Sequence, residues 1–354
     1  MRGRHLGTGP ARLRRIAGLF AALLFAASFC LAAQPAAATP IAAITRGHVP
    51  PPPHEQAGGT PGLLPAPAAG VPAKQPPSDL ARARAYLFRG ALGPIFSRGI
   101  DRLGAELRRA GITANVYEFT RCDAIADTAI AAYRQNPAPI VLIGHSMGGR
   151  CGLQFAEKLQ ARHIPVSLLV TIDPAHLSPD VPLNVERFIN VFLANSILGG
   201  GNIQPTPGFQ GNYASYDLSQ HGGVFHITID KIETIHRQLV DKIVDLAATP
   251  ATAEGEPAPL PLRYVVPPSS KIELWDSGMA VAAHAGDTLQ SLAMEYQVPL
   301  WSLAQANPTV DSGPLAAGQQ IVVPRHLRPP LTAVATPSST RPLQGAATAA
   351  LQRR

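Results

Sequence analysis

The chain has 354 residues, of which 46% are hydrophobic, so it is long enough for two ordinary domains with hydrophobic cores. Its formal net charge is +7, but five arginines within the first 15 residues account for most of that excess. The rest of the chain is close to neutral and has no basic stripe with interleaved aromatic residues. The composition therefore argues against a nucleic-acid-binding protein.

The amino-terminal segment has the pattern of an export signal. Arginines precede an uninterrupted apolar run over residues 16–33, and small residues follow at 36–38. We assign residues 1–33 to this signal. The run is also just long enough to cross a bilayer, so an uncleaved membrane anchor is the alternative, and we expect membrane contact only in that case. Either way we expect the bulk of the chain in the periplasm or cell envelope, or secreted.

Residues 34–77 are rich in proline and alanine and predict an extended spacer. Regular periodicity then predicts one domain over residues 78–248. Strands are expected at 85–88, 114–119, 140–143, 166–172 and 188–192, and helices at 100–110, 124–133, 147–156 and 232–246. This alternation predicts an α/β fold with a mainly parallel sheet covered by helices on both faces. Ligands bind such sheets at the carboxyl ends of the strands.

Export affects whether the cysteines are expected to be oxidised. Beyond the signal only Cys122 and Cys151 remain, an even pair for an oxidising compartment. Cys122 follows one expected strand and Cys151 lies about one helical turn after the next. A disulfide between them and a pair of buried thiols are both compatible with this pattern.

Ser146 lies in the most informative motif of the chain. Four apolar residues at 140–143 lead into Gly144-His-Ser-Met-Gly148, and a helical pattern follows. A strand-to-helix turn this tight leaves no room for a Cβ on either side of the serine and holds the serine in a strained conformation. The hydroxyl then stands clear of the sheet at a helix N-terminus, where developing negative charge is stabilised.

A serine hydroxyl needs a base, and the base needs an acid to orient it. Asp173 ends the expected strand at 166–172, and His226 precedes the final helix, which gives the order serine, acid, histidine. All three should therefore lie at one edge of the sheet. Asp217 is the substitute acid and His221 the substitute base. His145, inside the motif, is expected to be a packing residue.

These motifs resemble a compact α/β-hydrolase of the lipase, esterase and thioesterase superfamily. The resemblance implies Ser146 as nucleophile, His226 as general base and Asp173 as its orienting partner. It also implies an oxyanion hole made by the Met147 amide and by the amide of Ala91 or, as second choice, Leu92. Two departures are the Arg89-Gly90 pair, where many relatives have His-Gly, and an acid one strand earlier than usual. No cofactor and no metal are expected.

A second module follows a Pro/Ala-rich linker at 249–261. Residues 262–328 contain a β-α-α-β pattern with its core at 278–324, which resembles a LysM module. The resemblance implies binding of peptidoglycan or another glycan that contains N-acetylglucosamine. The contacts carried over are Gly286, Asp287, Thr288, Leu289, Asn307 and Pro308. Residues 329–354 predict a disordered tail.

The sequence thus predicts an exported serine hydrolase that cleaves an acyl ester or thioester and is held on peptidoglycan by the LysM module. Three alternatives stay open at this point. The protein transfers acyl groups to wall material, acts as an amidase on wall peptides, or is a wall-binding protein without catalysis.

Overall fold

The computed structural model describes residues 83–246 and 258–327. The predicted signal, the 34–77 spacer, most of the 249–261 linker and the predicted tail lie outside the described residues. Within the two described ranges, no helix is both long and apolar enough to cross a membrane.

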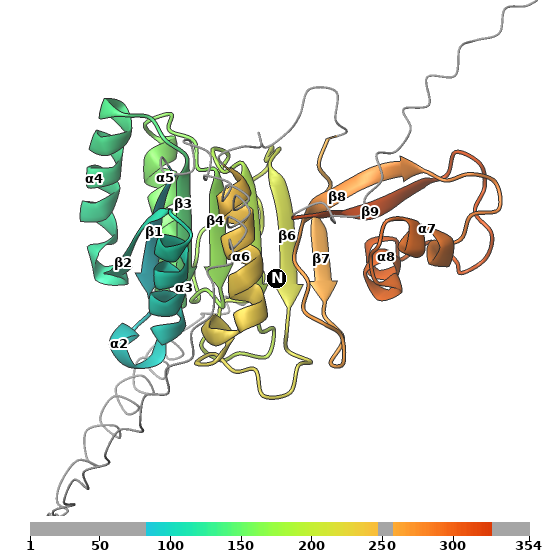
Figure 1. Cartoon of the computed structure of the whole chain (residues 1–354), viewed down its shortest axis with the longest axis horizontal. Coiled ribbons are helices and arrows are strands. Elements are labelled where there is room, and N and C mark those ends of the chain that lie inside the picture. Colours follow the sequence, from blue (N-terminus) through green and yellow to red (C-terminus); the bar gives the residue numbers. More distant parts are fainter. Residues whose placement is uncertain (1–82, 247–257, 328–354) are drawn as a thin grey trace, which may run out of the picture. The chain divides into compact units, whose positions relative to one another are not determined.

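A seven-stranded parallel sheet in the order β2-β1-β3-β4-β5-β6-β7 forms the larger part of the described chain (Figure 1). Its strands are β1 Arg84–Arg89, β2 Thr113–Glu118, β3 Ile140–His145, β4 Leu168–Ile172, β5 Arg187–Phe192, β6 Asn212–Asp217 and β7 Leu262–Val265. Because every neighbouring pair is parallel, all carboxyl ends lie at one edge. The sheet therefore has the α/β architecture that the sequence predicts.

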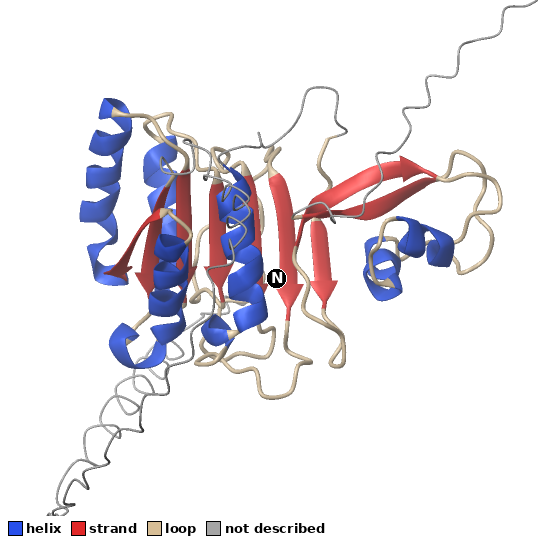
Figure 2. Ribbon diagram, viewed as in Figure 1, coloured by secondary structure: helices blue, strands red, loops and turns tan. Residues whose placement is uncertain are grey.

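Helices cover both faces of this sheet (Figure 2). They are α2 Gly93–Phe96, α3 Arg98–Arg109, α4 Cys122–Gln135, α5 Met147–Gln160 and α6 Glu233–Leu246, with short 3₁₀ turns η2 Phe119–Arg121 and η3 Ile229–Lys231. Alternate strand residues point to opposite faces. In β1, Leu87 packs in the core under α3 and α6, whereas Phe88 packs in the core under α4 and α5.

The carboxyl-terminal part forms a small α+β unit. Its elements are β8 Trp275–Ala282, α7 Leu289–Glu295, α8 Leu300–Ala306 and β9 Gln320–His326. The strands β8 and β9 pair in antiparallel fashion, and the two helices pack on them around a core that includes Leu292, Leu303 and Ile321. The β-α-α-β order agrees with the sequence prediction.

Two strands of the large sheet were not expected from the sequence. β6 is buried along its whole length although it contains Asn212, Ser215 and Asp217, so its pattern lacks the apolar alternation of a half-buried strand. β7 lies at the start of the region that the sequence assigns to the LysM module, yet it pairs with β6 and completes the large sheet. The sheet is thus two strands wider than predicted.

Cys122 and Cys151 form a disulfide, with their Cα atoms 5.7 Å apart. Cys122 begins α4 and Cys151 lies in the first turns of α5. The bond therefore ties together the two helices on one face of the sheet, next to the turn that carries Ser146.

Candidate active site

Ser146 occupies the sharp turn between β3 and α5. Its φ is 57° and its ψ is −123°, a conformation that L-residues adopt only under constraint. A Cβ on Gly144 would lie 2.0 Å from the Gly148 carbonyl oxygen, and one on Gly148 would lie 2.1 Å from the Phe88 carbonyl oxygen. The steric reason for both glycines is therefore present in the structure.

His226 and Asp173 meet Ser146 at the same edge of the sheet. The His226 Nε2 atom lies 3.1 Å from the Ser146 Oγ atom, and its Nδ1 atom lies 2.6 Å from the Asp173 Oδ2 atom. Asp173 is fully buried, and its Oδ1 atom accepts a hydrogen bond of 3.2 Å from the Leu193 amide. The carboxylate can thus hold the ring with Nε2 directed at the hydroxyl. The structure brings together the three residues that the sequence selects.

Asp217 and His221, the alternative acid and base, do not take part in the contact of Ser146, His226 and Asp173. Asp217, at the end of β6, accepts hydrogen bonds through Oδ1 from the amides of Ala194 and Ser219, at 3.0 and 2.9 Å. His221 lines a pocket on the loop before His226, and its buried Nε2 atom has no hydrogen-bond partner among the described residues. Neither side chain contacts Ser146, so Asp173 and His226 are the better assignments.

The turn after β1 lies directly over the serine. A Cβ on Gly90 would be 2.7 Å from the Ser146 Cβ atom, so the backbone at Gly90 passes close to this serine. Among the described residues the amides of Ala91 and Leu92 donate no hydrogen bond, and the Met147 amide at the start of α5 has no intrahelical acceptor. These three amides are the ones the resemblance assigns to an oxyanion hole.

Arg89 anchors this turn from the side of β1. Its guanidinium forms ion pairs with Asp101 on α3 and with Glu118 at the end of β2, the latter at 2.8 Å. These contacts raise the pKa of Arg89, chiefly through the hydrogen bond to Asp101. The departure from the His-Gly pair is therefore structural, since Arg89 braces the turn from outside.

His145 does more than pack. The Gly90 amide donates to the Ser97 Oγ atom at 3.0 Å, Ser97 Oγ lies 2.8 Å from His145 Nδ1, and His145 Nε2 lies 2.8 Å from the His226 carbonyl oxygen. A carbonyl only accepts, so Nε2 carries the proton, Nδ1 accepts, and the Ser97 hydroxyl donates. This chain links the turn over Ser146 to the loop of His226. Sequence reasoning missed it because Ser97 is 48 residues from His145.

Burial, and next the nearby His226 ring, lower the pKa of His145 to about 4. The pKa of a histidine in an unfolded chain is about 6.5. Between pH 4 and pH 6.5 (approximately), the unfolded chain therefore binds more protons than the folded one, and acid favours unfolding. We expect the contribution of neutral His145 to the free energy of unfolding to be complete above about pH 6.5. It should fall by up to about 3 kcal/mol as the pH approaches 4. Urea unfolding of the wild type and of His145→Gln across this range measures it. A stability difference between the two proteins that does not change with pH would contradict the prediction.

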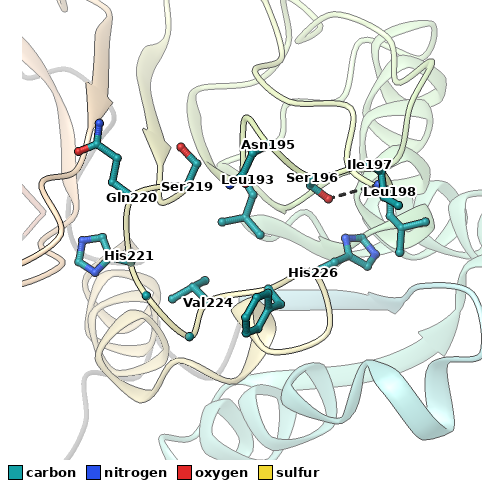
Figure 3. A pocket seen from close by; sticks show the side chains of 13 residues that line it. Leu193, Asn195, Ser196, Ile197, Leu198, Ser219, Gln220, His221, Val224 and His226 are labelled. Atoms are coloured by element: carbon teal, nitrogen blue, oxygen red, sulfur yellow. Dashed lines mark hydrogen bonds between the residues drawn. The ribbon is translucent and has the colours of Figure 1, made fainter.

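A pocket of about 520 Å³ opens beside His226 (Figure 3). The loop after β5 contributes Leu193, Ile197 and Leu198, and the loop before His226 contributes Val224 and Phe225. These side chains are apolar, and one end of the pocket reaches His226. The pocket is therefore suited to an apolar group attached to the reacting carbonyl.

Two of the predicted glycan-contact residues have structural roles in the small unit. Leu289 is buried in its core. Asn307 donates to the carbonyls of Leu303 and Val322, both at 2.8 Å, and accepts from the Val322 amide at 2.7 Å. Its side chain thus fastens α8 to β9 and has little bonding capacity left for a sugar.

The other four predicted residues lie on two loops. Gly286 and Asp287 form the turn before α7. The Gly286 amide donates a hydrogen bond to the Leu315 carbonyl, which holds this turn to the loop before β9. Thr288 caps α7 together with Ser291. Pro308 follows α8 and lines a groove at the edge of the large sheet. The turn before α7 and the loop before β9 are therefore neighbours.

Comparisons with known proteins follow this division of the chain. Residues 95–186 match the family model of the Thioesterase domain, and residues 284–324 match that of the LysM domain. None of the curated proteins compared matches the chain significantly. Among the described residues, no group of three or more His, Cys, Asp or Glu side chains is arranged to hold a metal ion.

One of the solved structures similar to this chain is a protein from Xanthomonas campestris pv. campestris that is described as a hydrolase of the α/β superfamily. It is 17% identical, with a TM-score of 0.32, and the match covers 45% of this chain and 97% of the other. A hyperthermophilic esterase from Pyrobaculum calidifontis is 15% identical, with a TM-score of 0.35, and the match covers 48% of this chain and 77% of the other.

The parallel sheet, the glycine-flanked serine turn at its edge and the two family models agree with one another. The chain combines an α/β domain, of which residues 95–186 match the Thioesterase domain, with a carboxyl-terminal LysM domain, a type of module that binds glycans containing N-acetylglucosamine.

Proposed function

We propose that this protein is an exported serine hydrolase that cleaves an ester or thioester bond and is held on peptidoglycan by its LysM domain. One observation carries the proposal. Ser146, His226 and Asp173, far apart in sequence, are joined by contacts of 3.1 and 2.6 Å at the carboxyl edge of the sheet. This is the arrangement of a nucleophile, its base and the acid that orients the base.

The chemistry follows from these contacts. His226 Nε2 takes the proton as Ser146 Oγ attacks the carbonyl carbon, while buried Asp173 stabilises the imidazolium. The amides of Met147 and Ala91 donate to the oxyanion of the tetrahedral intermediate. His226 then gives its proton to the leaving oxygen or sulfur, which leaves an acyl group on Ser146. Water, deprotonated by His226, releases the acid and restores the serine.

The surface around the site supports an apolar acyl group. Eight of the twelve large apolar side chains exposed in the described residues come from the segments that follow β1, β4, β5 and β6, at the edge of the sheet where Ser146 lies; two of them belong to the short helix α2. This apolar rim consists of Leu92, Ile95, Phe96, Leu177, Ile197, Leu198, Phe225 and Ile227. Such a concentration is unusual on a free surface and is typical of contact with an apolar ligand.

Three features support export and attachment to the cell wall. The first 33 residues have the pattern of an export signal. The Cys122–Cys151 disulfide is characteristic of an oxidising compartment. The LysM match adds a domain of a type that binds glycans containing N-acetylglucosamine, and peptidoglycan is such a glycan.

A fluorophosphonate probe tests the nucleophile directly. We expect a single adduct on Ser146, located by peptide mass spectrometry, because its hydroxyl has His226 as a base within hydrogen-bonding reach and lies beside amides for the anionic phosphoryl oxygen, whereas Ser97, which contacts His145, is buried. Ser146→Ala should give no adduct. Ser167→Ala, at the opposite edge of the sheet, is the matched control and should be labelled like the wild type. A folded wild-type protein that stays unlabelled, or is labelled at another serine, would refute the proposal.

A further inference from the structure

We propose that a groove between the hydrolase sheet and the LysM domain binds the sugar part of the substrate, so that the ester cleaved at Ser146 is carried by the glycan itself. This inference rests on the proposed hydrolase function and names its substrate class, an acylated glycan. The LysM domain is then part of the substrate site and does more than attach the enzyme to a wall.

The groove lies at the same sheet edge as Ser146 and has a volume of about 510 Å³. Phe192, Asp217 and Val265, the last residues of β5, β6 and β7, contribute to its hydrolase side. Gln305 and Pro308, from α8 and the loop after it, contribute to its LysM side. Both domains thus supply walls to one cavity.

The LysM wall is fixed to the sheet. The Gln305 side chain accepts a hydrogen bond of 2.9 Å from the Val265 amide and donates one of 2.8 Å to the Val265 carbonyl. This pairing satisfies the open edge of β7 and holds α8 against it. The groove is therefore preformed, which reduces the ordering cost of binding a ligand.

Asp217 indicates that a polar ligand belongs in the groove. This carboxylate is only 7% exposed, and Oδ1 is occupied by the two loop amides at 3.0 and 2.9 Å. Among the described residues Oδ2 has no hydrogen-bond donor. Because Asp217 lines the groove, a hydroxyl or N–H group of a ligand bound there would be placed to donate to Oδ2.

Asn202 supplies the complementary group. Its Oδ1 atom accepts from the hydroxyls of Tyr213 and Ser215, at 2.9 and 2.6 Å. The Nδ2 group is left to donate, since none of the described residues accepts from it. Gln220, which is exposed, and the Arg263 guanidinium also line the groove. The site therefore offers acceptors and donors side by side.

This combination selects a sugar over other ligands. A free anion could pair with Arg263 but not with Asp217, and a hydrocarbon chain would leave Asp217 and Asn202 without hydrogen-bond partners. A saccharide brings hydroxyl and acetamido groups that can bond to both residues. Pro308, one of the residues the LysM resemblance places at the glycan, belongs to the same groove.

The groove and the apolar pocket beside His226 are neighbours along the sheet edge. Gln220 lines both the groove and the apolar pocket, and that pocket ends at His226. Ser146 follows β3 and Asp217 ends β6, three strands away, which at the spacing of parallel strands is on the order of 15 Å. One sugar cannot span this distance, so the ligand is an oligosaccharide that extends from Ser146 toward the LysM domain.

Three substrates with the same acyl group but different alcohol parts would measure how much the groove contributes to kcat/KM. They are O-acetylated N-acetylchitotetraose, O-acetylated N-acetylglucosamine and 4-nitrophenyl acetate. We expect Asp217→Asn, which keeps the Oδ1 acceptor but removes the charge, to lower kcat/KM about tenfold on the acetylated tetramer. The two small esters do not reach the groove and should change less than about twofold. Asp127→Asn, an exposed carboxylate on α4, is the matched control and should behave as the wild type.

The outcomes separate this inference from the proposed function. Equal kcat/KM of the wild type on the acetylated tetramer and monomer, or an equal loss on all three esters in Asp217→Asn, would overturn the groove assignment and leave the hydrolase intact. Hydrolysis of none of the esters would overturn the proposed function. In that case calorimetric binding of N-acetylchitotetraose still tests the groove, since weaker binding by Asp217→Asn supports it and unchanged binding refutes it.

Discussion

Replacing Ser146 by alanine should lower kcat for ester hydrolysis by about 10⁴- to 10⁶-fold and leave the protein folded. The reason is that the acyl-enzyme cannot form without the hydroxyl, whereas the remaining oxyanion amides and binding contacts accelerate hydrolysis only modestly. Steady-state kinetics with 4-nitrophenyl esters from acetyl to palmitoyl would measure the loss and also show which acyl length the apolar pocket prefers.

Circular dichroism and urea unfolding provide the control for this variant. The Ser146 side chain makes one hydrogen bond, to His226, so its removal disturbs little beyond the site. Since the three side chains act as one unit, the double variant Ser146→Ala/His226→Ala should be no slower than Ser146→Ala alone. Substantial turnover by folded Ser146→Ala would exclude the serine mechanism.

The contact among Ser146, His226 and Asp173 was predictable from sequence because the positions of these residues are marked by local signals. The glycines around Ser146 are required by a single tight turn, and Asp173 directly follows a run of apolar residues that can only be a buried strand. The parallel arrangement then places the ends of separate strands at one edge. Local pattern and general topology were sufficient for this part of the site.

The edge of the sheet next to the LysM domain was not predictable in the same way. β6 contains the buried polar residues Asn212, Ser215 and Asp217, whose partners are distant in sequence. Asn212, for example, accepts a hydrogen bond of 2.7 Å from Ser277 in β8. A buried strand with such a sequence is favourable only once those partners are in place, and no local pattern reports them. The role of His145 was missed for the same reason.

The contacts of β8 also show that the LysM domain is built into the hydrolase. Trp275 is fully buried in the core cluster under α3 and α6, and its amide and carbonyl both bond to the Tyr216 hydroxyl, at 2.5 and 2.8 Å. Burial raises the pKa of Tyr216, which keeps the phenol protonated as the donor. A carboxyl-terminal domain joined only by a flexible linker would not bury its tryptophan in the core of the other domain. The strand β8 is therefore part of the core of the large sheet domain.

Replacing Asp276 by alanine should therefore destabilise the hydrolase and not only the LysM domain. The Asp276 Oδ2 atom lies 3.4 Å from Arg187 Nε on β5 and 3.1 Å from Lys242 Nζ on α6, and all three side chains are less than 10% exposed. Without the carboxylate two buried cations lose their shared counter-charge, and burial already lowers the pKa of Lys242. Breaking a buried ion pair from one side costs about 3–5 kcal/mol.

Urea unfolding followed by esterase activity and by tryptophan fluorescence would measure this effect. We expect both signals of Asp276→Ala to shift together to lower urea, because the strand that carries Asp276 belongs to the hydrolase core. Asp311→Ala, an exposed carboxylate of the LysM domain, should unfold like the wild type. If Asp276→Ala instead unfolds the LysM domain while esterase activity persists at wild-type urea concentrations, the two domains are separable. The groove between them would then not be a fixed binding site.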